Sequence, residues 1–158
     1  MSVVFYRIDD RLVHGQIMTA WAKVLDIDRI IVVDDLTAQN TFLAQVMRLS
    51  VPDGFEVQVC SGSDGAGAIL TDGALCRTMV LTKTPEEMEK LLLSGVSPAE
   101  VNVGGLGERG GRRGLCRGIS VDESELATLK RIAARGVTVY CQSVPDARKV
   151  IISEETKL

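Results

Sequence analysis

The chain of 158 residues is long enough for one domain with a substantial core, and its 46% hydrophobic and 25% charged residues are typical of a soluble globular protein. Its formal net charge of −3 argues against a general nucleic-acid binder, because phosphate backbones favour a basic surface. The sequence contains no apolar run of about eighteen residues and no N-terminal signal peptide pattern, so we expect a cytoplasmic protein without a membrane span.

The first predicted elements flank the single histidine of the chain, His14. Residues 3–6 form a short apolar, β-branched run that predicts a strand. Apolar residues then recur at helical spacing between Ile17 and Leu25. His14 therefore lies where a strand leads into a helix, which is where ligands bind in open α/β sheets.

The middle of the chain alternates between predicted strands and helices. Strands are predicted at residues 30–33, 55–60 and 78–81, and a weakly favoured helix at residues 61–71. Thr37 is the expected N-cap of another helix, and Thr84 with Pro85 and Glu87 forms a strong start for a helix that ends at Gly95. The apolar residues expected on the inner side of the helix after Thr37 are Leu43, Val46, Met47 and Leu49.

The last third continues this alternation. Strands are predicted at residues 101–103, 115–120 and 137–140, and Asp122 with Glu125 starts a helix that Gly136 ends. Pro145 is expected to open a final helix reaching about Ile152. The pattern predicts an α/β fold in which residues 1–158 form a single domain, with a doubly wound, mostly parallel open sheet and helices on both faces.

The neighbours of His14 have the chemistry to hold a phosphoryl group on its ring. Histidine offers a nucleophilic ring nitrogen near neutral pH, and the first turn of the following helix attracts anions. Arg7 and Arg11 carry guanidinium groups that suit phosphate oxygens, and Asp9 or Asp10 is expected to fix the other ring nitrogen. The alternative is that His14 is an ordinary surface or capping residue beside a solvated loop.

A second candidate feature is the glycine-rich segment 105–114. It matches G-x-G-x-x-G literally, but a strand rather than a helix is predicted after it, so it fits the dinucleotide fingerprint poorly. We expect a mobile loop whose Arg109, Arg112 and Arg113, together with nearby Arg117, attract an acidic partner or a phosphorylated donor. Two alternative functions remain on this basis, a nucleotide-binding α/β protein using this loop and a non-catalytic interaction module.

Other candidate residues have weaker support. The four cysteines form no C-x-x-C pair and there is only one histidine, so we expect no metal site and treat the cysteines as buried, reduced residues. Four polar residues follow predicted strands and are candidates for the same sheet edge as His14, with structural roles favoured for the first two: Lys83, Thr84, Gln142 and Ser143.

Four sequence segments resemble the IIB proteins of the mannose–fructose–sorbose family of the sugar phosphotransferase system. These are RIDDRLVHGQIMTAW at residues 7–21, NVGG at residues 102–105, and the similarly spaced residues 119–121 and 144–145. The resemblance extends over essentially the whole chain. It implies a phosphotransferase in which His14 accepts a phosphoryl group at Nδ1 from a IIA protein and passes it to a sugar presented by membrane IIC and IID subunits.

The same resemblance implies the roles of the neighbouring groups. Arg11 would stabilise the phosphate, an aspartate would orient the ring, and neither a cofactor nor a metal is required because phosphohistidine is already an activated donor. A homodimer is also expected from the family. The identity of the sugar stays open at this point.

Overall fold

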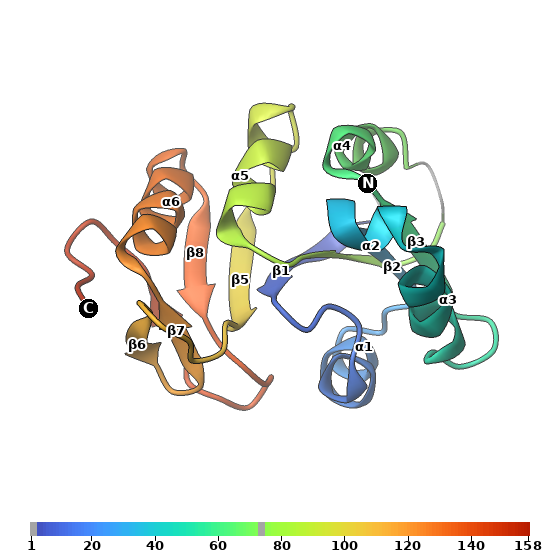
Figure 1. Cartoon of the computed structure of the whole chain (residues 1–158), viewed down its shortest axis with the longest axis horizontal. Coiled ribbons are helices and arrows are strands. Elements are labelled where there is room, and N and C mark those ends of the chain that lie inside the picture. Colours follow the sequence, from blue (N-terminus) through green and yellow to red (C-terminus); the bar gives the residue numbers. More distant parts are fainter. Residues whose placement is uncertain (1–2, 73–74) are drawn as a thin grey trace.

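The computed structural model describes residues 3–72 and 75–158, and it is built on one seven-stranded sheet (Figure 1). Six strands are parallel in the order β3-β2-β4-β1-β5-β8, and β9 adds antiparallel to the edge at β8. The predicted α/β fold with a mostly parallel sheet is confirmed. The strands of this sheet are β1 (Val3–Asp9), β2 (Arg29–Val33), β3 (Glu56–Cys60), β4 (Thr78–Thr82), β5 (Glu100–Gly105), β8 (Thr138–Cys141) and β9 (Val150–Ile151).

Helices lie on both faces of the sheet, as the sequence predicts (Figure 1). Alternate residues of each strand bury into two separate apolar cores, because successive side chains of a strand point to opposite faces. Tyr6 and Ile8 join the core under α4, α5 and α6, whereas Phe5 joins Trp21 in the other core. The helices are η1 (Ile17–Trp21), α1 (Ala22–Val24), α2 (Asp35–Gln39), α3 (Thr41–Leu49), α4 (Gly62–Leu70), α5 (Pro85–Leu93) and α6 (Glu123–Ala134).

The helix expected after Thr37 is in fact two helices, and the predicted N-cap is wrong. Asp34 caps α2 by accepting hydrogen bonds from the backbone N–H and the hydroxyl of Thr37, which is buried. Asn40 then breaks the helix in extended conformation and caps α3 through Leu43 N. Asparagine and aspartate are both preferred N-caps, so the sequence itself indicates a second helix start at Asn40.

The inner side expected for α3 is also wrong for three of its four residues. Leu43, Val46 and Leu49 are 41%, 46% and 75% exposed. Only Met47 packs against a core, and Ala44 is the buried residue of this helix. The apolar periodicity of α3 therefore marks a face turned away from the sheet.

Two further corrections concern the C-terminal third. The strand predicted at residues 115–120 is an antiparallel hairpin of β6 (Arg113–Cys116) and β7 (Ile119–Val121), separated at Gly118, whose φ of +79° favours glycine. The final helix predicted from Pro145 is absent, and Val150–Ile151 pairs with β8 instead. The side-chain amide of Gln142 holds this segment in turns by donating to the carbonyls of Pro145 and Ala147.

Candidate functional site

His14 lies just beyond the carboxyl end of β1, in the loop that leads to η1 and α1. Leu12 anchors this loop because its side chain is buried. Its backbone takes a left-handed φ of +55°, which is uncommon for a residue other than glycine. The His14 side chain is 15% exposed, so the ring is neither sealed in the interior nor free in solvent. Helical backbone begins immediately after it, and the carbonyl of His14 accepts the N–H of Met18.

The carboxylate of Asp9 orients the imidazole. His14 Nε2 lies 2.9 Å from Asp9 Oδ2, which leaves Nδ1 as the ring nitrogen that Asp9 does not engage. Asp9 is fully buried and also accepts from the backbone N–H of Arg11 at 3.0 Å. Burial alone would raise the pKa of Asp9, but the hydrogen bond from His14 and the charge of Arg7 outweigh it and lower that pKa. The lowered pKa favours the ionised form of the carboxylate that faces the ring.

Arg7 holds Asp9 from behind. Its guanidinium is fully buried and donates to Asp9 Oδ2 at 3.0 Å, to Asn102 Oδ1 at 2.7 Å and to the carbonyls of Gln142 and Ser143. It also lies 5.1 Å from the ring centroid of Trp21. With its donors engaged inside the protein, Arg7 positions Asp9 and does not offer the phosphate contact expected from the sequence.

The two glycines that end β5 make room for this buried pair. A Cβ at Gly104 would lie 1.8 Å from the guanidinium carbon of Arg7, and a Cβ at Gly105 would lie 2.6 Å from a carboxylate oxygen of Asp9. Asp9 also pairs with Gly105 in the β1–β5 register. The NVGG segment therefore has a physical role that sequence reasoning missed: its asparagine binds Arg7 and its glycines accommodate the ion pair.

Arg11 is the guanidinium that remains accessible at the site. Its side chain is 49% exposed, and its contacts are long, 3.4 Å from Nε to Asp9 Oδ1 and 3.4 Å to Gln16 Oε1. Arg11 and His14 thus share the same carboxylate. A tetrahedral anion bound to the imidazole ring would therefore lie near the positive charge of Arg11.

Asp10 and Arg112 hold the glycine-rich segment in place. Asp10 Oδ2 accepts from Gly107 N at 2.9 Å and lies 3.5 Å from Arg112, whereas no bond from Asp10 to His14 occurs among the described residues. Arg112 is 2% exposed and forms two bonds of 2.8 and 2.7 Å with the buried carboxylate of Glu125. These bonds tie the segment that was expected to be mobile to Asp10 and Glu125. The segment leads into β6 rather than into a helix, as the sequence predicts.

The four arginines of this region have different environments. Arg112 is internal, whereas Arg109 is 62% exposed and only loosely paired with Glu125 at 3.8 Å. Arg113 and Arg117 are exposed on the hairpin. Three of the four therefore remain available on the surface as a positive group.

A carboxyl pair lies at the same edge of the sheet, where β2 and β4 end. Glu87 accepts from the backbone N–H of Lys83, and Thr84 caps α5 by accepting from Glu87 N. Burial together with the hydrogen bond and negative charge of Asp34 raises the pKa of Glu87 to about 7. This pair stabilises the starts of α2 and α5, and Thr84 has the capping role that the sequence favours.

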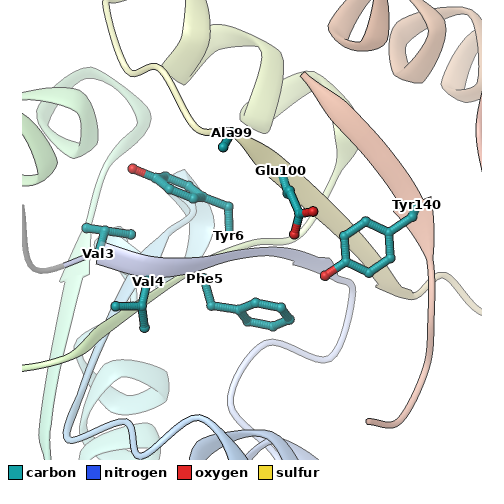
Figure 2. Close-up of a pocket in the computed structure, with 7 residues that line it drawn as sticks. All are labelled: Val3, Val4, Phe5, Tyr6, Ala99, Glu100 and Tyr140. Atoms are coloured by element: carbon teal, nitrogen blue, oxygen red, sulfur yellow. The ribbon is translucent and has the colours of Figure 1, made fainter. Parts of the chain in front are cut away.

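The pocket in Figure 2 is separate from His14. It has a volume of about 280 Å³ and lies at the opposite ends of the strands, where β5 begins at Glu100 beside the first residues of β1. The rings of Tyr6 and Phe5 point to opposite sides of β1 there, and Tyr140 faces Glu100 (Figure 2). We therefore place the candidate site at the open surface around His14 rather than in this pocket.

Among residues 3–72 and 75–158, no helix has the length and apolar composition needed to span a bilayer. Over the same described ranges, no three His, Cys, Asp or Glu side chains are grouped so that they could hold a metal ion.

The chain is similar to known proteins over most of its length. The family model described as "PTS system sorbose subfamily IIB component" matches residues 3–156. The chain is 33% identical to the fructose-specific EIIB component of Bacillus subtilis, covering 92% of this chain and 90% of that protein. It is 35% identical to the mannose-specific EIIAB component of Escherichia coli over 91% of this chain, but it spans only 45% of that longer protein.

Solved structures agree with these sequence matches. The IIBSor domain of the sorbose permease from Klebsiella pneumoniae superposes with a TM-score of 0.86 at 28% identity, covering 95% of this chain and 93% of that one. A structure described as "phosphoenolpyruvate-dependent phosphotransferase system" gives a TM-score of 0.85 at 32% identity, covering 96% of this chain and 94% of that chain.

Proposed function

The chain belongs to the sorbose subfamily of PTS IIB components, a family of phosphotransferases, and from this premise we propose that His14 is its phosphoryl acceptor. In this proposal a IIA phosphohistidine donates the phosphoryl group to His14, which passes it to a sugar during uptake through membrane IIC and IID subunits. The observation that carries the proposal is the 2.9 Å contact between Asp9 and His14 Nε2. It fixes the ring with Nδ1 available for attack.

The transfer needs positioning and charge stabilisation more than covalent chemistry from the protein. Nδ1 of His14 attacks the phosphorus, the new N–P bond forms, and the N–P bond of the donor breaks. The ionised Asp9 stabilises the positive charge that the ring gains, as the aspartate of a hydrolytic triad does. Arg11 then neutralises the phosphoryl oxygens from the solvent side, and the helix start beyond Gly15 adds N–H donors.

Asp9 and Arg7 act together in this scheme. A carboxylate buried without compensation would favour protonation and would then offer His14 no negative charge. Arg7 prevents this by pairing with Asp9, and Gly104 and Gly105 leave space for the pair. We assign Arg7 the role of a positioning residue that acts through Asp9. Asp10 acts less directly, because it binds the backbone of Gly107 and so holds the loop beside the site.

The test is phosphorylation of the purified chain by phosphoenolpyruvate, the general phosphotransferase proteins and a IIA protein. We expect the chain to take up one phosphoryl group that is labile in acid and stable in alkali. His14→Gln should take up none while keeping the circular dichroism of the unmodified protein. Stable labelling of His14→Gln would refute the assignment to His14, and absence of label on the unmodified chain would favour the interaction-module alternative.

The remaining family properties follow as proposals. We propose that residues 1–158 act as a single IIB domain, because one family match spans residues 3–156. We also propose a cytoplasmic location, where phosphoenolpyruvate supplies the donor, and a homodimer that light scattering would detect. Relatives named for mannose, fructose and sorbose are all similar, at 35%, 33% and 29% identity, so we expect the membrane subunits to select the sugar. A sugar panel with the assembled system would identify it.

A further inference from the structure

Two cysteine residues line one cavity between the β6–β7 hairpin and the end of β8. Cys116 ends β6 and Cys141 ends β8, so the two residues belong to different sheets. Cys116 packs against the apolar core that contains Cys141, and both residues line one cavity. The two cysteines are separated by 24 residues and belong to no C-x-x-C motif.

The two thiols differ in their access to solvent. Cys141 is fully buried, whereas Cys116 is partly exposed. Both line a cavity of about 280 Å³ that Arg117 and Arg148 also line. One thiol can therefore be reached by a small molecule, and the other lies directly behind it.

The surroundings of the cavity favour reaction at Cys116. The neighbouring thiol of Cys141 lowers the pKa of Cys116, whereas the thiol of Cys116 together with burial raises the pKa of Cys141. Two arginines, Arg117 and Arg148, line the same cavity, and the thiolate is the reactive form of cysteine. This arrangement combines an exposed attacking thiol with a buried resolving thiol.

We propose that Cys116 and Cys141 are a dithiol modification site that a hydroperoxide oxidises to an intramolecular disulfide. The sulfur of Cys116 takes one oxygen of the peroxide as the O–O bond breaks, and the second oxygen leaves as water or an alcohol. The sulfur of Cys141 then attacks the sulfenic acid, the S–O bond breaks, and water leaves as the S–S bond forms. The two thiols together lose two electrons and two protons, and the peroxide is reduced.

The disulfide would fasten the hairpin to the segment that completes the histidine site. Cys141 precedes Gln142 and Ser143, whose carbonyls accept hydrogen bonds from Arg7. The oxidation itself needs only the two thiols and a peroxide. It is therefore independent of phosphoryl transfer and can be tested on the chain without partner proteins.

The test treats the intact, reduced chain with about one equivalent of hydrogen peroxide. We expect the number of thiols titrated after denaturation to fall from four to two and the mass to fall by about 2 Da. Peptide mapping under non-reducing conditions should join the peptides of Cys116 and Cys141, and dithiothreitol should separate them. Persistence of four thiols, a bond involving Cys60 or Cys76, or a sulfinic acid at Cys116 beside a free Cys141 would each overturn the proposal.

Variants separate the roles of the two sulfurs. Cys116→Ser, at the partly exposed position, should give no mass loss. Cys141→Ser should leave a sulfenic acid at Cys116 that a dimedone reagent traps. Cys76→Ser is the matched control and should form the disulfide as the unmodified chain does, and a disulfide formed in Cys116→Ser would also overturn the proposal.

Discussion

Removing the guanidinium of Arg11 is the sharpest test of the proposed chemistry, because Arg11→Ala should affect the reaction and leave the fold intact. The side chain is 49% exposed and its bonds to Asp9 and Gln16 are both 3.4 Å long. Such contacts contribute little to stability, about 0.5 kcal/mol or less. Loss of one preorganised charge at the developing anion typically costs about 10²–10³-fold in rate, or about 2.7–4 kcal/mol. We therefore expect phosphorylation to slow by this factor.

The assay is rapid-quench measurement of phosphoryl transfer from phosphorylated IIA at saturating donor. Arg109→Ala is the matched control, since Arg109 is 62% exposed and lies on the glycine-rich segment outside the histidine loop. The control should transfer at nearly the unmodified rate, and Arg11→Lys should recover part of the loss because it restores the charge. A normal rate in Arg11→Ala, or an equal loss in Arg109→Ala, would refute the role assigned to Arg11.

Three other predictions test the supporting structure. Asp9→Asn should slow phosphorylation by about 10³-fold or more in a rapid-quench assay, because it removes the charge at His14 Nε2; a rate within tenfold of normal would contradict the orienting role. Gly104→Ala should lower the free energy of unfolding by about 3 kcal/mol or more in a urea titration, whereas Gly110→Ala, with no atom within 4 Å of the new Cβ, should change it by about 0.5 kcal/mol or less. Glu87 has its pKa raised to about 7 in the folded state, so its contribution to stability is fully present below about pH 4.5 and is lost as the pH rises through 7. The thermal midpoint should accordingly fall between pH 5 and pH 8, and Glu87→Gln should flatten that dependence; an unchanged slope in the variant would show that another group is responsible.

The sheet was predictable from sequence because its strands are short apolar runs between helices with clear caps. Asp122 and Glu125 form a complete capping box at α6, as their spacing predicts. The errors arose where side-chain hydrogen bonds and strand pairing, rather than the apolar pattern, decided the conformation. The segment after Pro145 has a plausible helix start, but the side chain of Gln142 binds its carbonyls and β8 offers an edge for Val150.

The position of the candidate site could be predicted from the sequence, but several of its contacts could not. The location of His14 after a strand required only the apolar pattern and the rule for strand ends. The predicted strand ended at Tyr6, whereas β1 continues to Asp9. Arg7 and Asp9 therefore share a strand and, at a spacing of two residues, point the same way. Charged residues inside a strand do not follow the apolar pattern by which strands are predicted. Their burial as a pair requires the space left by Gly104 and Gly105, which the sequence around Arg7 and Asp9 does not indicate.

The bonds of Arg7 also have a consequence for how the protein acquires its activity. They join β1 to Asn102 and to the carbonyl of Ser143, which are 95 and 136 residues away along the chain. Contacts of such sequence separation form late, because loop-closure entropy must be overcome first. A nascent chain thus exposes its histidine loop long before the last partners of Arg7 emerge. The full set of Arg7 bonds that holds Asp9 beside His14 can therefore form only after Ser143 has been synthesised.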